Sequence, residues 1–284
     1  MKSSVNHFSG ERQKITPAAI LSFQKKISRY FSKRGRDLPW RNTDNPYHIL
    51  VSEIMLQQTQ VERVIEKYGQ FIKQFPDFYR FSRAPLRKIL TVWQGLGYNR
   101  RAIALKQIAC KVMEEYHGNL PSDPEVLKTF PGIGEATAGA VAAFTFNQPA
   151  IFLETNIRRV FIHHFFSHKA AVRDTEISPL IEKTLDTSDP RKWYYALMDY
   201  GAMLKKEQEN PNRRSAHYQR QSPFEGSNRQ IRGMILRVLM KGTPLSKSEI
   251  AKRIGRSVHD VNDNLMQLQK EGFIKKAGGK FSIA

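Results

Sequence analysis

The stretch LKTFPGIGEATAGAVAAFTF (residues 127–146) predicts two helices joined by a glycine hairpin. Pro131 ends the first helix, and Gly132 and Gly134 permit the positive φ angles and close backbone approach of a tight turn. The second helix then begins at about Ala136 with its first amide groups unpaired. Because a helix N-terminus carries roughly half a positive charge, these amides can bind a phosphate group. An ordinary helix–helix turn explains a Pro-Gly-x-Gly pattern equally well.

The residues after this hairpin favour the first interpretation. An apolar run, Ile151–Leu153, leads to the acid Glu154, and Asn156 and a helix starting at Arg158 and Arg159 follow.

The composition of the chain indicates an anionic partner. Its 284 residues carry a formal charge of +20, and 40% of them are hydrophobic, which is enough for a substantial core. We expect nucleic acid rather than a membrane as the partner. The chain has neither an eighteen-residue apolar run nor the apolar core of a signal peptide, so we expect a soluble cytoplasmic protein.

Metal sites are not expected. The single cysteine, Cys110, excludes internal disulfides and any cysteine-ligated cluster or zinc site. His164 and His168 have the spacing of metal ligands on a helix, but the sequence offers no evident third ligand.

Changes in pattern divide the chain into four parts. Residues 1–15 look disordered, and residues 16–204 read as a series of helices. Residues 205–228 are rich in Lys, Arg, Asn, Ser, Gln and Pro and read as a basic linker. Residues 229–284 predict three helices and a two-stranded ribbon with a Gly278-Gly279 turn, which is the winged-helix form. Such a module binds either DNA or protein.

Several side chains of the first domain suit a base-handling enzyme. Glu53 lies among apolar neighbours in a predicted helix at about 47–60, and desolvation there would raise its pKa toward that of a proton donor; a solvated helix face is the alternative. Trp40 lies in a basic loop and either stacks on a base or packs in the core. Tyr98 is followed by Arg100 and Arg101, which suits a loop that wedges into DNA and holds phosphates. Asp199 is a further acid within an apolar stretch.

Taken in order, five motifs resemble the helix-hairpin-helix DNA glycosylases, and within them the MutY-type adenine DNA glycosylases. The resemblance covers about residues 16–204, and an ordered series is far more specific than any single motif. The motifs are LPWR (38–41), SEIMLQQTQV (52–61), GLGY (95–98), PGIG (131–134) and ALMDYGA (196–202).

This resemblance implies a role for each matching residue. Glu53 matches the family's proton donor to the adenine ring, Glu154 its essential aspartate, and Asp199 an acid that lines the base pocket. The implied base-pocket residues are Arg36, Leu38, Trp40, Arg41, Ala136 and Asn156. The implied DNA-binding residues are Gln57, Gln58, Tyr98, Arg100, Gly132, Gly134, Thr137, Arg213 and Arg214, with Gln58 and Tyr98 matching those that enter the duplex.

Four departures from the family pattern matter. Glu154 is one methylene longer than the aspartate it matches, and a carboxylate displaced by about 1 Å can lose on the order of 10²-fold in rate. Ala136 stands where the lyase branch carries its Schiff-base lysine, which predicts a monofunctional hydrolase. The four-cysteine iron–sulfur motif expected after Asp199 is missing. The domain that reads oxidised guanine is replaced by the apparent winged helix.

The sequence therefore predicts a mainly α protein, a helix-hairpin-helix glycosylase domain followed by a small α+β winged helix. We expect a monomer that acts on double-stranded DNA and hydrolyses the N-glycosidic bond of adenine opposite guanine or 8-oxoguanine. It would need no cofactor, although a monovalent cation could sit at the hairpin carbonyls. Two alternatives stay open: a thymine or uracil glycosylase acting on mispairs with guanine, and a catalytically silent DNA-binding regulator.

Overall fold

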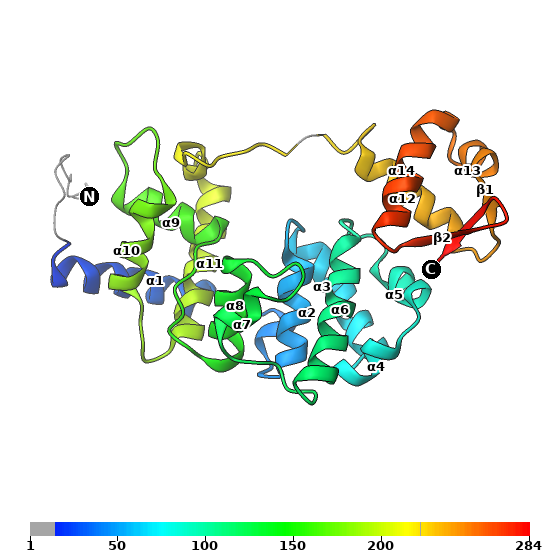
Figure 1. The fold of residues 1–284 in the computed structure, drawn as a ribbon. Helices are drawn as coiled ribbons and strands as arrows, with labels where there is room; N and C mark the ends of the chain where they lie inside the picture. Colours follow the sequence, from blue (N-terminus) through cyan, green and yellow to red (C-terminus); the bar gives the residue numbers. More distant parts are fainter. Residues whose placement is uncertain (1–14, 222) are drawn as a thin grey trace. The chain divides into compact units, whose positions relative to one another are not determined.

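The computed structural model describes residues 15–221 and 223–284, so residues 1–14 of the predicted disordered N-terminus lie outside the described residues. The fold is mainly helical with a small C-terminal sheet, as predicted (Figure 1). The chain forms two compact units. Of the described residues, one unit comprises 15–37 and Glu135–Gln219, and the other comprises Leu38–Gly134 and those of 220–284. In the described part, none of the helices combines the length and the apolarity that crossing a bilayer requires.

The first unit is built on the long helix α11, which packs against α1, α8 and α9. Helix α8 is apolar on all sides and buried from Ala138 to Thr145, as expected of a central helix. Gly139 permits its closest contact, because a Cβ atom there would lie 2.6 Å from Cβ of Phe152. The elements are α1 (Pro17–Arg34), α8 (Glu135–Phe146), α9 (Thr155–Phe165), α10 (Asp174–Thr184), α11 (Pro190–Glu207) and the 3₁₀ helix η2 (Pro211–Arg214).

The first unit extends further along the chain than the predicted start of the linker at residue 205. Helix α11 continues to Glu207, and η2 packs against α9 with Pro211 and Asn212 buried. Ser215 then forms a β-bridge with Val172. The polar composition misled the prediction because three of its polar side chains, Asn210, Asn212 and Arg214, bond to α9 and its ends.

In the second unit, six α-helices and a 3₁₀ helix precede the winged-helix module. Four aromatic side chains, Phe71, Phe75, Phe81 and Trp93, meet edge to face and fill the core between α3, α4 and α5. Helix α4 was not predicted. Asp77 is its N-cap, and its side chain accepts a hydrogen bond from the backbone N–H of Arg80. The elements are η1 (Pro39–Arg41), α2 (Pro46–Leu56), α3 (Val61–Gln74), α4 (Phe78–Arg83), α5 (Leu86–Trp93), α6 (Arg100–Glu115) and α7 (Pro124–Lys128).

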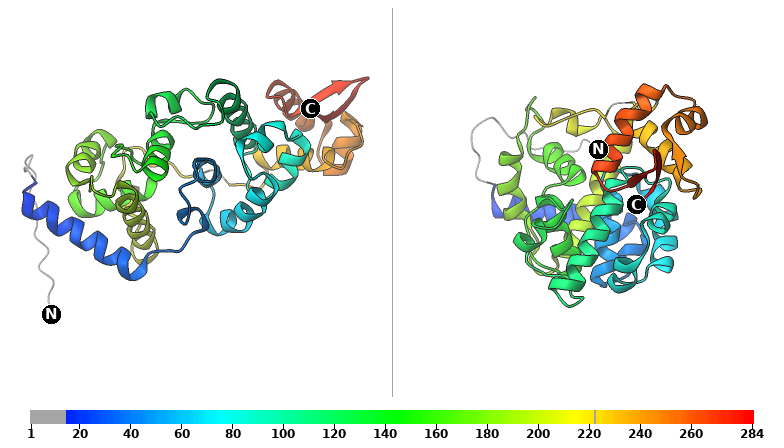
Figure 2. Two further views of the ribbon diagram at one scale, coloured as in Figure 1. Left: turned by 90° about the horizontal axis from the view of Figure 1, so that it is seen from below. Right: turned by 45° about the vertical axis from the view of Figure 1, so that its right-hand side comes forward.

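The winged-helix module is present as predicted, with one additional short strand. Its antiparallel sheet has the order β1-β3-β2, and Gly278 and Gly279 turn the chain between β2 and β3 with positive φ angles. The β2–β3 ribbon is the red hairpin beside the module's helices in Figure 2. The elements are α12 (Asn228–Leu239), β1 (Leu245–Ser246), α13 (Lys247–Ile254), α14 (Val258–Lys270), β2 (Ile274–Ala277) and β3 (Lys280–Ile283).

Two helical glycines should respond in opposite directions to an added methyl group. We expect Gly139→Ala to destabilise the protein by about 1–3 kcal/mol, because Phe152 would have to move. Gly69→Ala in α3 meets nothing within 4 Å and should stabilise by about 0.5–1 kcal/mol. Thermal unfolding followed by circular dichroism measures both, and equal shifts for the two variants would show that the α8 contact is not tight.

Candidate active site

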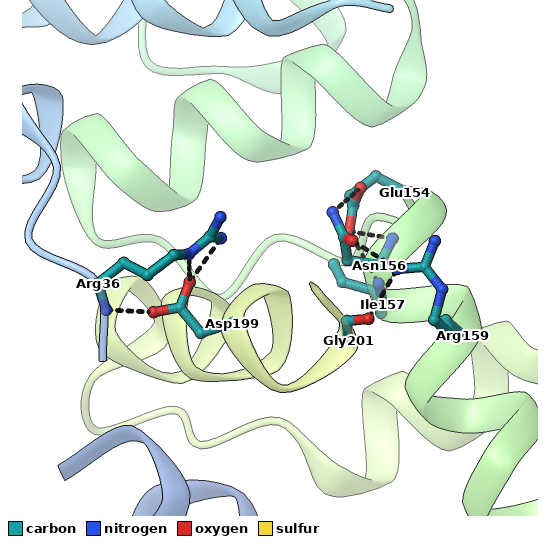
Figure 3. A network of polar contacts seen from close by, with 7 residues as sticks. All are labelled: Arg36, Glu154, Asn156, Ile157, Arg159, Asp199 and Gly201. Carbon is teal, nitrogen blue, oxygen red and sulfur yellow. Dashed lines mark hydrogen bonds and ion pairs between the residues drawn. The ribbon is translucent and has the colours of Figure 1, made fainter. Parts of the chain in front are cut away.

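Glu154, the predicted catalytic acid of the first unit, is the N-cap residue of α9. Its Oε1 accepts hydrogen bonds from the backbone N–H groups of Asn156 at 2.6 Å and Ile157 at 2.8 Å, and its Oε2 accepts from Nδ2 of Asn156 at 3.1 Å (Figure 3). The segment leading to it is fixed on α11 by Tyr194, which packs on Phe152 and donates to the Ala150 carbonyl at 2.7 Å. The carboxylate is thus held at the positive end of a helix.

The electrostatic setting of Glu154 combines opposing effects. Enclosure of the carboxylate raises its pKa, while the two amide hydrogen bonds and the charges of Arg159 and Arg158 lower it; the net direction is upward. Arg159 is almost fully buried and reaches the acid only through Asn156, whose Oδ1 accepts from Nη1 of Arg159 at 2.7 Å. Burial lowers the pKa of Arg159 and the charge of Glu154 opposes that shift. Asn156, predicted for the base pocket, is therefore a bridge between Arg159 and Glu154.

Arg159 also ties α9 to the rest of the first unit. Its Nη1 donates to the Gly201 carbonyl at 2.7 Å, and its Nε donates to Oδ1 of Asn210 at 2.9 Å. The approach of α11 to α9 requires glycine, since a Cβ atom at Gly201 would lie 2.3 Å from the Asn156 carbonyl oxygen. Asn212 completes the junction by donating to the Thr155 carbonyl at 2.8 Å. Residues placed in the predicted linker thus help to orient the candidate catalytic acid.

Asp199, the other acid of the first unit, lies on α11 and binds Arg36 (Figure 3). Its Oδ1 accepts from Nε of Arg36 at 2.7 Å and pairs with Nη2 at 2.6 Å, and its Oδ2 accepts from the Arg36 backbone N–H at 2.8 Å. The Asp199 side chain is buried, whereas about a third of the Arg36 side chain is exposed. The pair fixes the backbone immediately after α1.

Glu53, the predicted proton donor, belongs to the second unit. It is half-buried in α2 between the buried residues Ser52 and Ile54, so its immediate neighbours are apolar or enclosed as expected. The raised pKa of Glu53 stays a prediction.

The other residues of the second unit that were predicted to line the base pocket pack mainly in the hydrophobic core. Leu38 and Trp40 are buried, and Trp40 packs edge-on against Tyr68 with ring centroids 5.5 Å apart. Of the two interpretations of Trp40, core packing is the one that the structure shows, because the ring is 3% exposed. Arg41 is half-buried in η1.

Arg101 was expected to hold phosphate, and this expectation is wrong. The side chain is buried, and its guanidinium donates to main-chain carbonyls on both sides. Nη1 donates to the carbonyls of Ile54, Met55 and Gln57 at 2.9, 2.6 and 2.7 Å. Nη2 donates to the carbonyls of Leu96 and Gly97 at 3.1 and 3.0 Å, and to Oγ1 of Thr59 at 3.0 Å. Burial lowers the pKa of Arg101 to about 10.

The two residues expected to enter the duplex lie on the loops that Arg101 joins. Gln58 is exposed with a φ of 54°, and Tyr98 is half-exposed with a φ of 45°. Positive φ angles are uncommon in residues other than glycine and often mark functional turns. Gln57 braces the hairpin instead of facing away from it, because its Nε2 donates to the Gly132 carbonyl at 3.1 Å. Helix α2 ends at Leu56, before the predicted end at residue 60, since Arg101 takes up its last carbonyls.

The other predicted DNA-binding residues divide into exposed and structural ones. Gly134 and Arg100 are exposed, and Thr137 and Ala136 are half-buried in the first turn of α8. Arg213 is exposed and pairs with Glu209 at 2.9 Å. Arg214 was expected to contact phosphate, but it donates to the carbonyls of Phe166 and Ile162 and so caps the C-terminal end of α9.

No group of three or more His, Cys, Asp or Glu side chains suited to a metal occurs in residues 15–221 and 223–284. His164 is half-buried and packs edge-on against Phe23, and desolvation together with the charge of Lys26 lowers its pKa to about 3. It is therefore a neutral core residue. Cys110 lies in α6 with Sγ 3.7 Å from the Ser82 carbonyl. One cysteine does not fit a four-thiolate iron–sulfur cluster.

Replacing Arg101 should affect stability far more than replacing its neighbour. Arg101→Lys removes the planar fork and leaves several buried carbonyls unpaired, so we expect a loss of about 1.5–3 kcal/mol in the free energy of unfolding. Arg100→Lys, at an exposed side chain, should cost less than about 1 kcal/mol. Urea unfolding of both variants measures the difference, and similar small losses would refute the role assigned to Arg101.

Comparison with known proteins identifies the family. The model of the family described as "HhH-GPD superfamily base excision DNA repair protein" matches residues 51–183. The adenine DNA glycosylase of Mycolicibacterium smegmatis is 31% identical over 291 residues, covering 95% of this chain and 96% of that protein. The adenine DNA glycosylase of Buchnera aphidicola subsp. Baizongia pistaciae is 38% identical over 189 residues, covering 65% of this chain and 53% of that protein. The adenine DNA glycosylase of Mus musculus is 33% identical over 200 residues, covering 66% of this chain and 39% of that protein. The chain thus spans about half the length of the Buchnera relative and less of the mouse one.

Solved structures agree on the fold. A thermostable thymine-DNA glycosylase is 26% identical with a TM-score of 0.60, covering 68% of this chain and 90% of that one. A trapped endonuclease III–DNA covalent intermediate, at 18% identity and a TM-score of 0.58, covers 69% and 91% and shows the shared fold alone. The chain belongs to the HhH-GPD superfamily of base excision DNA repair proteins and, within it, to the MutY-type adenine DNA glycosylases.

Proposed function

We propose that this protein is a monofunctional DNA glycosylase that removes adenine mispaired with guanine or 8-oxoguanine. The observation that carries the proposal is the carboxylate of Glu154, which keeps an acid at the position of the family's essential aspartate and is held there by the α9 amides and Asn156. The names of the relatives in Mycolicibacterium, Buchnera and mouse support adenine as the base. The protein would act as a monomer on double-stranded DNA in the cytoplasm.

The chemistry follows from the two acids. An adenine must leave the base stack to be reached, at an unstacking cost of a few kcal/mol, and Gln58 and Tyr98 on their left-handed turns suit the space that it leaves. Glu53 donates a proton to the adenine ring as the bond from the base to C1′ breaks and its electron pair moves onto the base. The carboxylate of Glu154 stabilises the cationic sugar, and a water oxygen then bonds to C1′ while the water releases a proton, which restores the acid form of Glu53.

No iron–sulfur cluster and no lysine intermediate enter this scheme. The chain has one cysteine, so no step is routed through a cluster. Ala136 offers no amine at the start of α8, and Lys128 lies in α7 with Nζ 2.7 Å from Glu125. Hydrolysis without strand cleavage is the expected outcome.

A second candidate, removal of thymine or uracil opposite guanine, has one observation in its favour. The similarity to a thermostable thymine-DNA glycosylase covers 68% of the chain. The small side chain of Ala136 would then be the specificity determinant to examine.

The test is a single-turnover assay on labelled duplexes that contain A:8-oxoguanine, A:G, T:G or U:G pairs, each analysed with and without hot alkali. Strand breaks that appear only after alkali, and only from adenine duplexes, are expected. Release of thymine or uracil would establish the second candidate. Breaks without alkali would overturn the monofunctional assignment, and binding without any release would favour the silent regulator.

Glu53→Gln should lower the rate of base release by roughly 10²–10⁴-fold, because the proton donor is lost. Affinity for the same duplex should stay within about twofold, since the side chain keeps its shape and size. Glu66→Gln, at an exposed site of α3, is the matched control and should change neither quantity. Full activity of Glu53→Gln would sink the assignment of Glu53.

The pH dependence of the single-turnover rate should reflect the ionisation of Glu154. Because its pKa is raised and the reaction needs the ionised form, the single-turnover rate should begin to fall at a higher pH than the ordinary glutamate value of about 4.3 predicts. Glu154→Gln should lower the plateau rate at least about tenfold and remove this acidic limb. An unchanged limb in the variant would assign the titration to another group.

A further inference from the structure

The winged-helix module, Asn228–Ala284, contacts the second unit's helical part at the loop Gly95–Arg101. This is the loop that carries Tyr98 and Arg100, two of the residues expected to bind DNA. The contacts have three parts: an ion pair to Arg100, hydrogen bonds to Tyr98, and hydrogen bonds from Thr91 and Gln94, at the end of α5, to the sulfur of Met240.

The ion pair is bidentate. Glu271, the C-cap residue of α14, accepts from Nε of Arg100 at 2.8 Å and from Nη2 at 2.6 Å. Glu271 also accepts from Nη1 of Arg232 in α12 at 3.1 Å. Burial raises the pKa of Glu271, but the hydrogen bonds from Arg100 and Arg232 outweigh that effect and the pKa is lowered. A carboxylate bound to an arginine in this way has the geometry that a DNA phosphate would take.

The tyrosine is held at its hydroxyl and its ring. Arg229, in the first turn of α12, donates from Nη1 to the Tyr98 hydroxyl at 2.5 Å, and its guanidinium lies 5.5 Å from the ring centroid. Gln221 also donates to this hydroxyl. A ring held in this way is not available to enter a base stack.

The contact with α5 involves residues that have no part in the proposed chemistry. Sδ of Met240, at the end of α12, lies 3.5 Å from Nε2 of Gln94 and 3.9 Å from Oγ1 of Thr91. Gly242 lies beside Arg87, whose Nη1 would be 2.9 Å from a Cβ atom there.

The outward face of α14 argues against DNA reading by this helix. In a DNA-binding winged helix the corresponding helix lies in the major groove, where positive charge is favoured. Here the exposed residues of α14 include the acids Asp260 and Asp263 and the apolar Val258 and Met266. Lys270, at its end, is the one lysine or arginine in the helix.

We propose that the winged helix docks on the Gly95–Arg101 loop of its own chain in the absence of DNA, binds the Tyr98 hydroxyl and the Arg100 guanidinium, and is displaced when duplex DNA binds. The inference rests on the proposed DNA-binding role of these two residues. The exchange leaves no charge unpaired: Arg100 passes from Glu271 to a phosphate, and Glu271 keeps Arg232. The module therefore sets a threshold for DNA binding, and only a partner that offers both a phosphate and a site for the ring replaces both contacts.

The first test measures affinity for an undamaged duplex by fluorescence anisotropy. Glu271→Gln should bind about two- to fivefold more tightly than Glu249→Gln, because the docked state loses its ion pair. Glu249→Gln makes the same change of charge in the same module, and glutamine is compatible with its capping box with Ser246. Equal affinities of the two variants would overturn the proposal.

A second test holds the module in place without altering Tyr98 or Arg100. Gln94→Cys and Met240→Cys, in a Cys110→Ser background, are joined by a short bis-maleimide and compared with the same protein capped by N-ethylmaleimide. Cross-linking should weaken binding of the undamaged duplex at least about tenfold, and unchanged affinity would overturn the proposal.

The two tests separate this proposal from the proposed function. Because the duplex has no mispair, these binding measurements do not depend on base release. If the variants bind as expected but the mispaired duplexes show no base release, only the glycosylase assignment is overturned. If no variant binds duplex DNA at all, the DNA-binding role of the loop is wrong and the docking proposal falls with it.

Discussion

The hydrogen bonds of Arg101 determine how the second unit presents its functional loops. One planar guanidinium accommodates the last carbonyls of α2 and the carbonyls of the Gly95–Tyr98 loop. A buried arginine loses its hydration, and convergent carbonyl dipoles are what compensate for that loss. Gln58 and Tyr98 keep positive φ angles beside these bonds, since a fully bonded surrounding can maintain locally strained backbone. The helix that carries Glu53 and the loop that carries Tyr98 are therefore fixed by a single side chain.

The first unit uses a second buried arginine in a different manner. Arg159 does not form an ion pair with Glu154 but reaches it through Asn156. The Asn156 side-chain amide accepts a hydrogen bond from Arg159 and donates one to Glu154. A direct pair would neutralise the carboxylate, whereas the bridge orients it and leaves its charge to the substrate. The segment Asn210–Ala216 supports this arrangement with polar bonds to Arg159, Thr155 and Val172. In the family resemblance, the region after Asp199 is where the cluster motif would stand.

The sequence was sufficient for most of the helices, the turn at Gly132 and the winged helix, because each depends on local signals such as Pro131, Gly132 and the Gly278-Gly279 turn. The N-cap position of Glu154 could not be predicted, since glutamate is not among the preferred capping residues. The functions of Arg101 and Arg214 could not be predicted. Both resemble phosphate-binding residues in sequence, and only the tertiary structure shows that their partners are carbonyls at helix ends. Helix α4 was missed because six residues are too few to show a period.

The bond from Gln57 to the Gly132 carbonyl has a geometric consequence. The Gln57 backbone carbonyl accepts a hydrogen bond from Arg101, and Arg101 also donates to the carbonyl of Gly97, the residue before Tyr98. A continuous set of bonds thus runs from the hairpin to the tip of the aromatic loop within one unit. The spacing between Gly132 and the loop that carries Tyr98 is therefore set by bonds within the second unit. If Gly132 and Tyr98 both meet DNA as proposed, these two contacts would fall on every duplex at the same separation.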